Sequence, residues 1–145
     1  HKEYRRQRQM CIRDRHGTGH GVGSVLSVHE GPISISKTSE CVIENGMVIS
    51  NEPGYYINGK YGIRIENLEI VSKHNLKKSK NFFLHFENLT RVPLELKLIN
   101  KKMLTKFEID WVNEYHQKVF KDLSKFIETD HEELLIFLQR KTAPI

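Results

Sequence analysis

Three histidines and two glutamates, in separate segments marked by glycine or proline, are the residues of this 145-residue chain whose types and spacing could support catalysis. They are His16 and His20 in a glycine-rich run, His29 before Glu-Gly-Pro, Glu52 before Pro-Gly-Tyr-Tyr, and Glu66 in Ile-Arg-Ile-Glu-Asn. Imidazole and carboxylate groups bind divalent cations, and both also transfer protons. The set therefore predicts metal ligands and proton-transfer groups of a metallohydrolase active site.

The glycine-rich run determines how its two histidines can act. Glycines occupy positions 17, 19, 21 and 23, so an extended backbone would carry His16, Thr18 and His20 on one face. At ~3.3 Å per residue the two histidines would lie roughly 13 Å apart, too far to bind one ion. One should therefore be a metal ligand and the other a substrate or supporting contact. The glycine spacing fits neither a phosphate-binding loop nor a dinucleotide-binding loop, and the sequence has no HExxH motif.

Both glutamates are expected on strands. Pro53 disfavours helical geometry at Glu52 and so places its carboxylate at the end of an apolar strand. Alternation in a strand over 63–71 would put Arg64 and Glu66 on one face, within reach of each other or of one metal centre. Each pattern alone also fits a simpler interpretation, a solvated turn in the first case and an exposed ion pair in the second. Four further histidines, expected to be structural or exposed, are His74, His85, His116 and His131.

The elements that must position these residues change character along the chain. β-branched residues between turn residues predict strands at 42–43, 47–49, 63–71 and 82–92. An Asn-Gly pair at 58–59 predicts a hairpin turn. After residue 93 the pattern becomes helical, with capping boxes at 105–108 and 130–133 that begin two helices. Strands followed by helices predict an α+β protein.

The formal net charge of +5 comes mostly from the first residues. Residues 1–15 carry six Lys/Arg against two acidic residues, a net +4, which leaves +1 for the rest of the chain. This head has no apolar periodicity, and we expect it to be non-native sequence rather than a basic arm for an acidic partner. A basic cluster over 73–80 lacks interleaved aromatic residues and is expected to be a solvated hairpin loop. The charge pattern therefore predicts no nucleic-acid partner.

The composition, 38% hydrophobic and 28% charged, is that of a globular protein. No apolar run in the sequence approaches the ~20 residues that span a bilayer, and the polar first residues do not form a secretory signal. Two cysteines are too few for a disulfide framework. We therefore expect a cytoplasmic location and no membrane partner.

Together these segments resemble the pita-bread metallopeptidases of family M24, and within them the aminopeptidase P branch, which removes an N-terminal residue that precedes proline. The tail adds to the resemblance, since Phe-Glu-Asn-Leu-Thr at 86–90 and Thr-Ala-Pro-Ile at 142–145 are similar to the C-terminal extension of the larger members. The resemblance implies the C-terminal half of a pita-bread (creatinase/aminopeptidase) fold over 16–90. A mainly helical C-terminal extension would follow over 91–145.

The resemblance also implies roles for the candidate residues. His20, Glu52 and Glu66 match metal ligands for two divalent cations, and Glu52 also matches the general base toward the bridging water. Ligation by oxygen with a single imidazole suits Mn²⁺. His16 and His29 match histidines that contact the substrate and help to move protons. Arg64 matches an arginine of the family that holds the ligand carboxylates in place.

The implied activity is hydrolysis of the N-terminal Xaa-Pro bond of peptides with proline at the second position, through a dinuclear metal-bound hydroxide. The alternatives are a non-catalytic pita-bread module that binds peptides or proteins, and a prolidase-type dipeptidase. Two aspartate ligands of the family lie on earlier strands, so we expect these 145 residues to be a fragment and inactive alone. The extension is expected to pack on the catalytic core or to form a homodimer contact.

Overall fold

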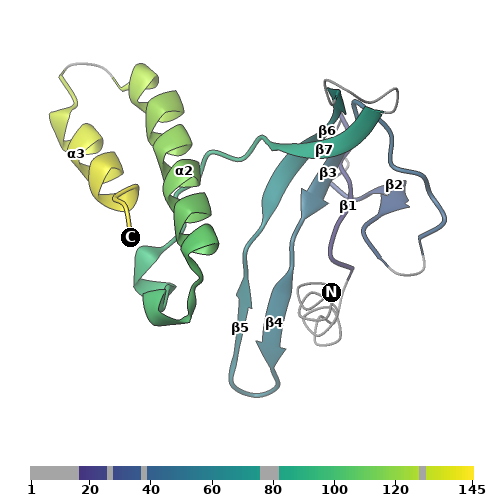
Figure 1. Cartoon of the computed structure of the whole chain (residues 1–145), viewed down its shortest axis with the longest axis horizontal. Helices are drawn as coiled ribbons and strands as arrows, with labels where there is room; N and C mark the ends of the chain where they lie inside the picture. The colour runs from purple at the N-terminus through teal and green to yellow at the C-terminus, as the bar shows by residue number, and fades with distance from the viewer. Residues whose placement is uncertain (1–16, 26–27, 37–38, 76–81, 128–129) are drawn as a thin grey trace. The chain divides into compact units, whose positions relative to one another are not determined.

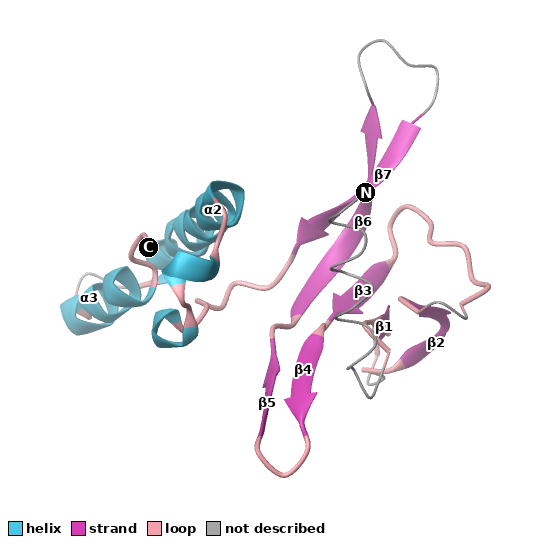
Figure 2. Cartoon of the chain, turned by 60° about the horizontal axis from the view of Figure 1, so that its bottom comes forward, coloured by secondary structure: helices cyan, strands magenta, loops and turns pink. Residues whose placement is uncertain are grey.

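The computed structural model describes residues 17–25, 28–36, 39–75, 82–127 and 130–145 (Figure 1). The chain divides into two compact units, one extending to Thr90 and the other running from Arg91 to Ile145. The described strands belong to the first unit and the described helices to the second (Figure 2). This order confirms the predicted α+β class.

The first unit is a five-stranded sheet, in which all neighbouring strands are antiparallel, with a separate two-stranded ribbon. In spatial order the sheet consists of β2 (Glu30–Ser34), β1 (His20–Gly21), β3 (Val48–Asn51), β6 (Asn67–Asn75) and β7 (Phe82–Asn88), and the ribbon of β4 (Gly54–Ile57) and β5 (Tyr61–Arg64). The turn at Asn58-Gly59 is confirmed, because it joins β4 to β5 with a φ of +68° at Gly59.

The core of the first unit lies on the central strands. Ile49 on β3 and Val71 on β6 are 0% and 1% exposed. β6 and β7 are paired as far as Asn75 opposite Phe82, so residues 73–75 of the predicted basic loop belong to a strand instead. The connecting residues 76–81 lie outside the described residues. The segments before and after β3 are thus connected to a hydrogen-bonded sheet.

Three predicted strands differ from the structure. The strand predicted at 82–92 is shorter, because β7 ends at Asn88. Residues 42–43 are not a strand, and the valine of this pair is 72% exposed. The predicted strand at 63–71 is two strands, because the chain changes its pairing partner from β4 to β3 at residues 65–66. The break has a consequence for the site, because Glu66 lies in it.

The second unit contains the helices α2 (Lys106–Leu123) and α3 (Glu132–Lys141). The predicted capping box of α2 is confirmed, because the Thr105 hydroxyl accepts from the Glu108 N–H at 3.3 Å and the Glu108 carboxylate accepts from the Thr105 N–H at 2.7 Å. Three short 3₁₀ helices complete the unit: η1 (Leu96–Leu98), η2 (Lys101–Met103) and η3 (Ser124–Phe126). None of the helices in the described ranges is long and apolar enough to cross a membrane.

The second predicted capping box, at Asp130 and Glu133, is wrong. The N-cap of α3 is His131, whose side chain makes no capping hydrogen bond. Both Glu132 and Glu133 lie in the first turn of the helix. The helix dipole favours carboxylates in the first turn. The start of this helix is therefore stabilised by these charges rather than by a capping side chain.

Side chains of α2 hold the extended segment 91–95 within the second unit. The Tyr115 hydroxyl donates to the Val92 carbonyl at 2.7 Å, and His116 Nε2 accepts from the Leu94 N–H at 3.0 Å. Tyr115 also packs with Val119 and Leu138 in the core of this unit. The segment before the helices is therefore part of their folded structure.

Candidate metal centre

His20 is placed by the glycines on either side of it. A Cβ atom at Gly19 would collide with the Ser50 carbonyl oxygen, and one at Gly21 with the Glu30 carbonyl oxygen. Glycine at both positions therefore lets β1 approach its two neighbours closely. In this position the His20 N–H donates to the Ser50 hydroxyl at 3.0 Å.

Glu52 is a buried carboxylate at the end of β3. The residue is 6% exposed, and its N–H donates to the Thr18 carbonyl at 2.7 Å. The Ser50 hydroxyl donates to Glu52 Oε1 at 3.4 Å. A buried charge is tolerated only with partners, so the surroundings of this carboxylate define the site.

Glu52 and Glu66 lie at two facing breaks in the strands. Asn51 pairs with Asn67 at the end of the β3–β6 ladder, and the β4–β5 ladder begins beyond it with Gly54 opposite Arg64. The two glutamates therefore belong to the gap between these ladders, where the backbone leaves regular pairing. Sequence alternation alone could not place them there, because it assumed one continuous strand.

His20 and Glu52 meet directly. Nε2 of His20 lies 3.1 Å from Glu52 Oε1, and Nδ1 lies 2.8 Å from the Gly21 carbonyl oxygen. A carbonyl can only accept, so Nδ1 carries the proton and Nε2 faces the carboxylate. A lone pair and a carboxylate oxygen at this distance need a proton or a metal cation between them. Metal-bound histidines are typically oriented by such a backbone contact, so this pair fits a divalent cation.

Arg64 connects the two glutamates. Its Nη1 lies 3.0 Å from Glu52 Oε2 and 3.7 Å from Glu66 Oε2. Its Nε donates to the Tyr56 hydroxyl at 3.0 Å, a contact that raises the pKa of Arg64 further above its ordinary value. The guanidinium therefore remains charged and can hold both carboxylates in place.

Tyr56 is a site residue that sequence reasoning missed. Cβ atoms at Gly54 and at Gly62, which pairs with Tyr56, would both collide with its side chain. The two glycines therefore leave room for the ring on the ribbon, where its hydroxyl reaches Arg64. The available signal in the sequence was a glycine two positions before the tyrosine, with a second glycine opposite it on the paired strand.

Ser50 was also missed, although its spacing offered a signal. Residues two apart on a strand point to the same face, so a serine two positions before Glu52 could reach it. The structure places this serine at 0% exposure, in contact with two of the three candidate ligands, His20 and Glu52.

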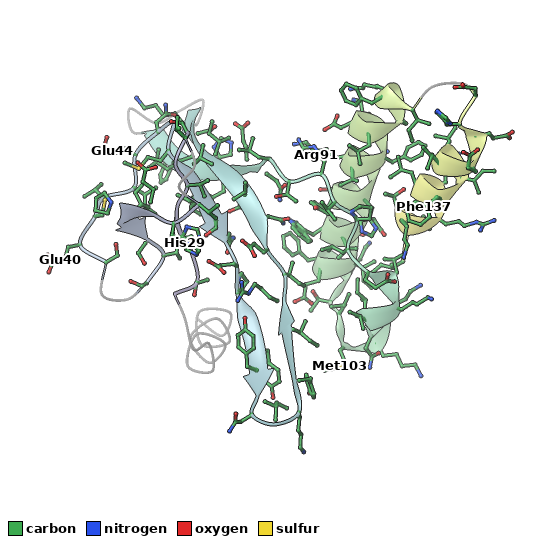
Figure 3. All side chains as sticks on the ribbon, turned by 180° about the vertical axis from the view of Figure 1, so that it is seen from behind. His29, Glu40, Glu44, Arg91, Met103 and Phe137 are labelled. Carbon is green, nitrogen blue, oxygen red and sulfur yellow. The ribbon has the colours of Figure 1, made fainter. Side chains whose placement is uncertain are left out.

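The other predicted site residues differ in how near they lie to His20 and Glu52. The His29 ring, labelled in Figure 3, lies 4.2 Å from the His20 ring, centroid to centroid. Glu66 approaches Glu52 through Arg64, and no group of three or more His, Cys, Asp or Glu side chains in the described ranges could hold a metal ion. His16 lies outside the described residues.

Three of the remaining histidines have described side chains, and these lie outside the site; the side chain of His74 is outside the described part of the chain. His85 pairs with Glu87 at 3.4 Å, and His131 with Glu133 at 3.7 Å, with both histidines exposed. His116 is buried in the second unit. These three agree with the expectation of structural or exposed histidines.

Comparison with known proteins matches two stretches of the chain to one metallopeptidase family. Residues 3–73 match metallopeptidase family M24, and residues 82–145 match the C-terminal region of peptidase M24. The probable Xaa-Pro aminopeptidase P of Coprinopsis cinerea is 46% identical over 138 residues, covering 90% of this chain and 22% of that protein. The corresponding protein of Fusarium vanettenii is 49% identical over 138 residues, with the same coverage of 90% and 22%.

A solved structure shows the same relationship. The X-prolyl aminopeptidase of Caenorhabditis elegans, a cytosolic enzyme with a di-nuclear active site, superposes with a TM-score of 0.78 at 41% identity. The match covers 90% of this chain and 21% of that one. The chain thus spans about a fifth of the length of the curated relatives it matches. In sequence and in fold, the chain belongs to metallopeptidase family M24, with the pita-bread fold and a helical C-terminal part.

Proposed function

We propose that this chain is part of a metal-dependent Xaa-Pro aminopeptidase and supplies three ligands, His20, Glu52 and Glu66, to a pair of divalent cations. The observation that carries the proposal is the contact of 3.1 Å between His20 Nε2 and Glu52 Oε1, with the tautomer fixed by the Gly21 carbonyl. Relatives named Xaa-Pro aminopeptidase P support the same activity.

The cations supply Lewis-acid polarisation of the scissile carbonyl and an activated water when they are bound. A ligand set of carboxylate oxygens with one imidazole favours Mn²⁺, whereas structural zinc sites are typically rich in thiolate ligands. The family resemblance assigns five ligands to such a centre. Residues 16–145 offer no match for the two aspartate ligands that the resemblance implies, and we propose that these two ligands come from another part of a longer protein.

In this proposal Glu52 also acts as the general base. Its carboxylate accepts a proton from the attacking water, whose oxygen adds to the carbonyl carbon of the Xaa residue. Arg64 Nη1, 3.0 Å from Glu52 Oε2, keeps the carboxylate oriented while its charge changes. Fixed donors of this kind lower the cost of reorganisation during the reaction.

The histidines would serve the substrate. An Xaa-Pro bond lacks an amide N–H, and its nitrogen must gain a proton as the C–N bond breaks. We assign His29, 4.2 Å from the His20 ring, and His16 to contact the peptide and to deliver that proton. The proton taken from water then balances the proton given to the proline nitrogen, and the products are a free amino acid and a peptide that begins with proline.

We further propose that residues 16–90 belong to the catalytic domain and residues 91–145 to the C-terminal extension. A cytoplasmic location and a homodimer contact through the extension are parts of the same proposal. The Caenorhabditis elegans protein, a cytosolic enzyme, supports the location.

The test is Mn²⁺-dependent release of the N-terminal residue from an Xaa-Pro-Xaa peptide by the full-length protein that contains this chain, with Glu52→Gln as the control. We expect release that the substitution abolishes. Bound Mn²⁺ without release would support a peptide-binding module instead, and a protein that binds no Mn²⁺ refutes the proposal. Cleavage of Xaa-Pro dipeptides but not of longer peptides would indicate a prolidase-type dipeptidase.

A further inference from the structure

Ser50 is the polar side chain between the two candidate ligands that are in contact. It is 0% exposed, accepts from the His20 N–H at 3.0 Å, and donates to Glu52 Oε1 at 3.4 Å. A hydroxyl has one proton and two lone pairs, so it can make both hydrogen bonds at once. The same oxygen therefore contacts the backbone of one ligand and the carboxylate of the other.

The two contacts join separate elements. His20 belongs to β1, whereas Ser50 and Glu52 lie at the end of β3. The ladder between these strands is short, since only Gly21 opposite Ile49 is paired. Hydrogen bonds beside the ladder therefore help to align the strands near the ligands. The His20 N–H donates to the Ser50 hydroxyl at 3.0 Å, the Glu52 N–H to the Thr18 carbonyl at 2.7 Å, and the Val22 N–H to the Val48 carbonyl at 3.0 Å.

We propose that Ser50 is a positioning residue for metal binding, which fixes the backbone at His20 relative to the carboxylate of Glu52 so that Nε2 and Oε1 converge on one cation. This inference rests on the proposed function. It concerns a residue outside the predicted ligand set and assigns the hydroxyl, rather than the volume of the side chain, as the functional group.

Without the hydroxyl the pair would lose its common partner. The His20 N–H would lie next to an apolar group in a buried place, and Glu52 Oε1 would lose a donor. Each loss favours a small separation of the strands, and a misplaced ligand pair binds a cation less tightly. Residues that orient metal ligands typically change metal affinity about 10- to 100-fold when they are replaced.

The experiment compares Ser50→Thr with Ser50→Val in the full-length protein that contains this chain. Threonine and valine have nearly the same shape, so both add the same volume to the buried position, and only threonine keeps the hydroxyl. Dissociation constants for Mn²⁺ are measured by titration calorimetry, and visible spectra are recorded with Co²⁺ as a second metal probe. Thermal unfolding of the metal-free variants reports stability separately.

We expect Ser50→Val to bind Mn²⁺ at least about 10-fold more weakly than Ser50→Thr and to change the Co²⁺ spectrum, with both variants folded. Equal Mn²⁺ affinity of the two variants overturns the role of the hydroxyl while leaving the proposed function intact. If the unsubstituted protein binds no Mn²⁺, both proposals fail together. If neither variant folds, Ser50→Ala is compared with the unsubstituted protein, because it removes the hydroxyl without adding volume, and equal Mn²⁺ affinity there is again a refutation.

Discussion

Arg64 Nη1 lies 3.0 Å from Glu52 Oε2, so the buried carboxylate has a permanent cation next to it whether or not a metal ion is bound. The same guanidinium donates from Nε to the Tyr56 hydroxyl, which leaves it little freedom to move away. The site is therefore partly organised by the protein alone.

Replacing Arg64 by lysine should separate its charge from its geometry. Lysine keeps the positive charge but cannot bridge Tyr56 and Glu52 with a planar fork. We expect Arg64→Lys to weaken Mn²⁺ binding by about 10-fold, and Arg64→Met by up to about 100-fold. Titration calorimetry on the full-length protein measures both. An affinity equal to that of the unsubstituted protein in the methionine variant would show that the carboxylates are held by other groups.

Replacing His29 should affect catalysis and not metal binding. Its ring packs on His20 at 4.2 Å, but in our proposal it acts on the substrate. We expect His29→Ala to lower kcat about 10²- to 10⁴-fold, as is typical for a lost proton-transfer group, with Mn²⁺ affinity changed less than about 3-fold. Parallel kinetic and metal titrations check this. A metal affinity that falls as far as kcat would make His29 a ligand rather than a substrate contact.

The stability of the second unit should fall in mild acid because of His116. Burial lowers the pKa of His116 below its ordinary value, while a backbone contact with Ala143 opposes this effect. The folded state favours neutral imidazole, so its contribution is fully present above the unfolded pKa of about 6.5 and is lost as the pH falls through the lower folded pKa. Protonation would also turn Nε2 into a donor facing the Leu94 N–H.

Urea unfolding between pH 7.5 and pH 5 tests this, with Glu95 and Asp122 still charged because their partners, Lys141 and Arg91, lower their pKa values. His116→Gln is the matched control, since its side-chain oxygen can accept from the Leu94 N–H without titrating. We expect the variant to lose less stability than the unsubstituted protein over this range. If the free energy of unfolding falls equally with pH in both proteins, other groups cause the acid sensitivity.

The two predicted capping boxes offer a direct comparison. Thr105→Ala removes a cap that is present and should cost about 1 kcal/mol in the free energy of unfolding. Asp130→Ala removes a residue that caps no helix and should cost less than about 0.5 kcal/mol. Chemical denaturation of the two variants measures both values. A larger loss for Asp130→Ala would mean that the aspartate stabilises the protein in another way.

Features determined by neighbouring residues could be predicted from the sequence. The Asn58-Gly59 turn and the Thr105 box each depend on a few adjacent positions, and both are present. The break at 65–66 could not be predicted, because it arises where the chain exchanges one partner strand for another. The N-cap of α3, His131, could not be predicted, because first-turn carboxylates and a capping box that begins with aspartate have almost the same sequence pattern.

The same distinction applies to the site. The chemical types and order of His20, Glu52 and Glu66 indicated a metal centre, and the contact of the first two agrees with this hypothesis. The supporting residues required three-dimensional information. Tyr56 reaches Arg64 only because two glycines on paired strands leave room for its ring, and Ser50 reaches His20 across strands distant in sequence.

The attachment of segment 91–95 to α2 has a practical consequence for protein engineering. A truncated version of the helical unit that started at Pro93 would lack Arg91, which pairs with Asp122 at 2.6 Å, and Val92, whose carbonyl accepts from Tyr115. The Tyr115 hydroxyl would then be left without its acceptor in a partly buried place. An expression boundary directly after Thr90 retains every one of these contacts, and so determines where the helical unit can be separated from the strands.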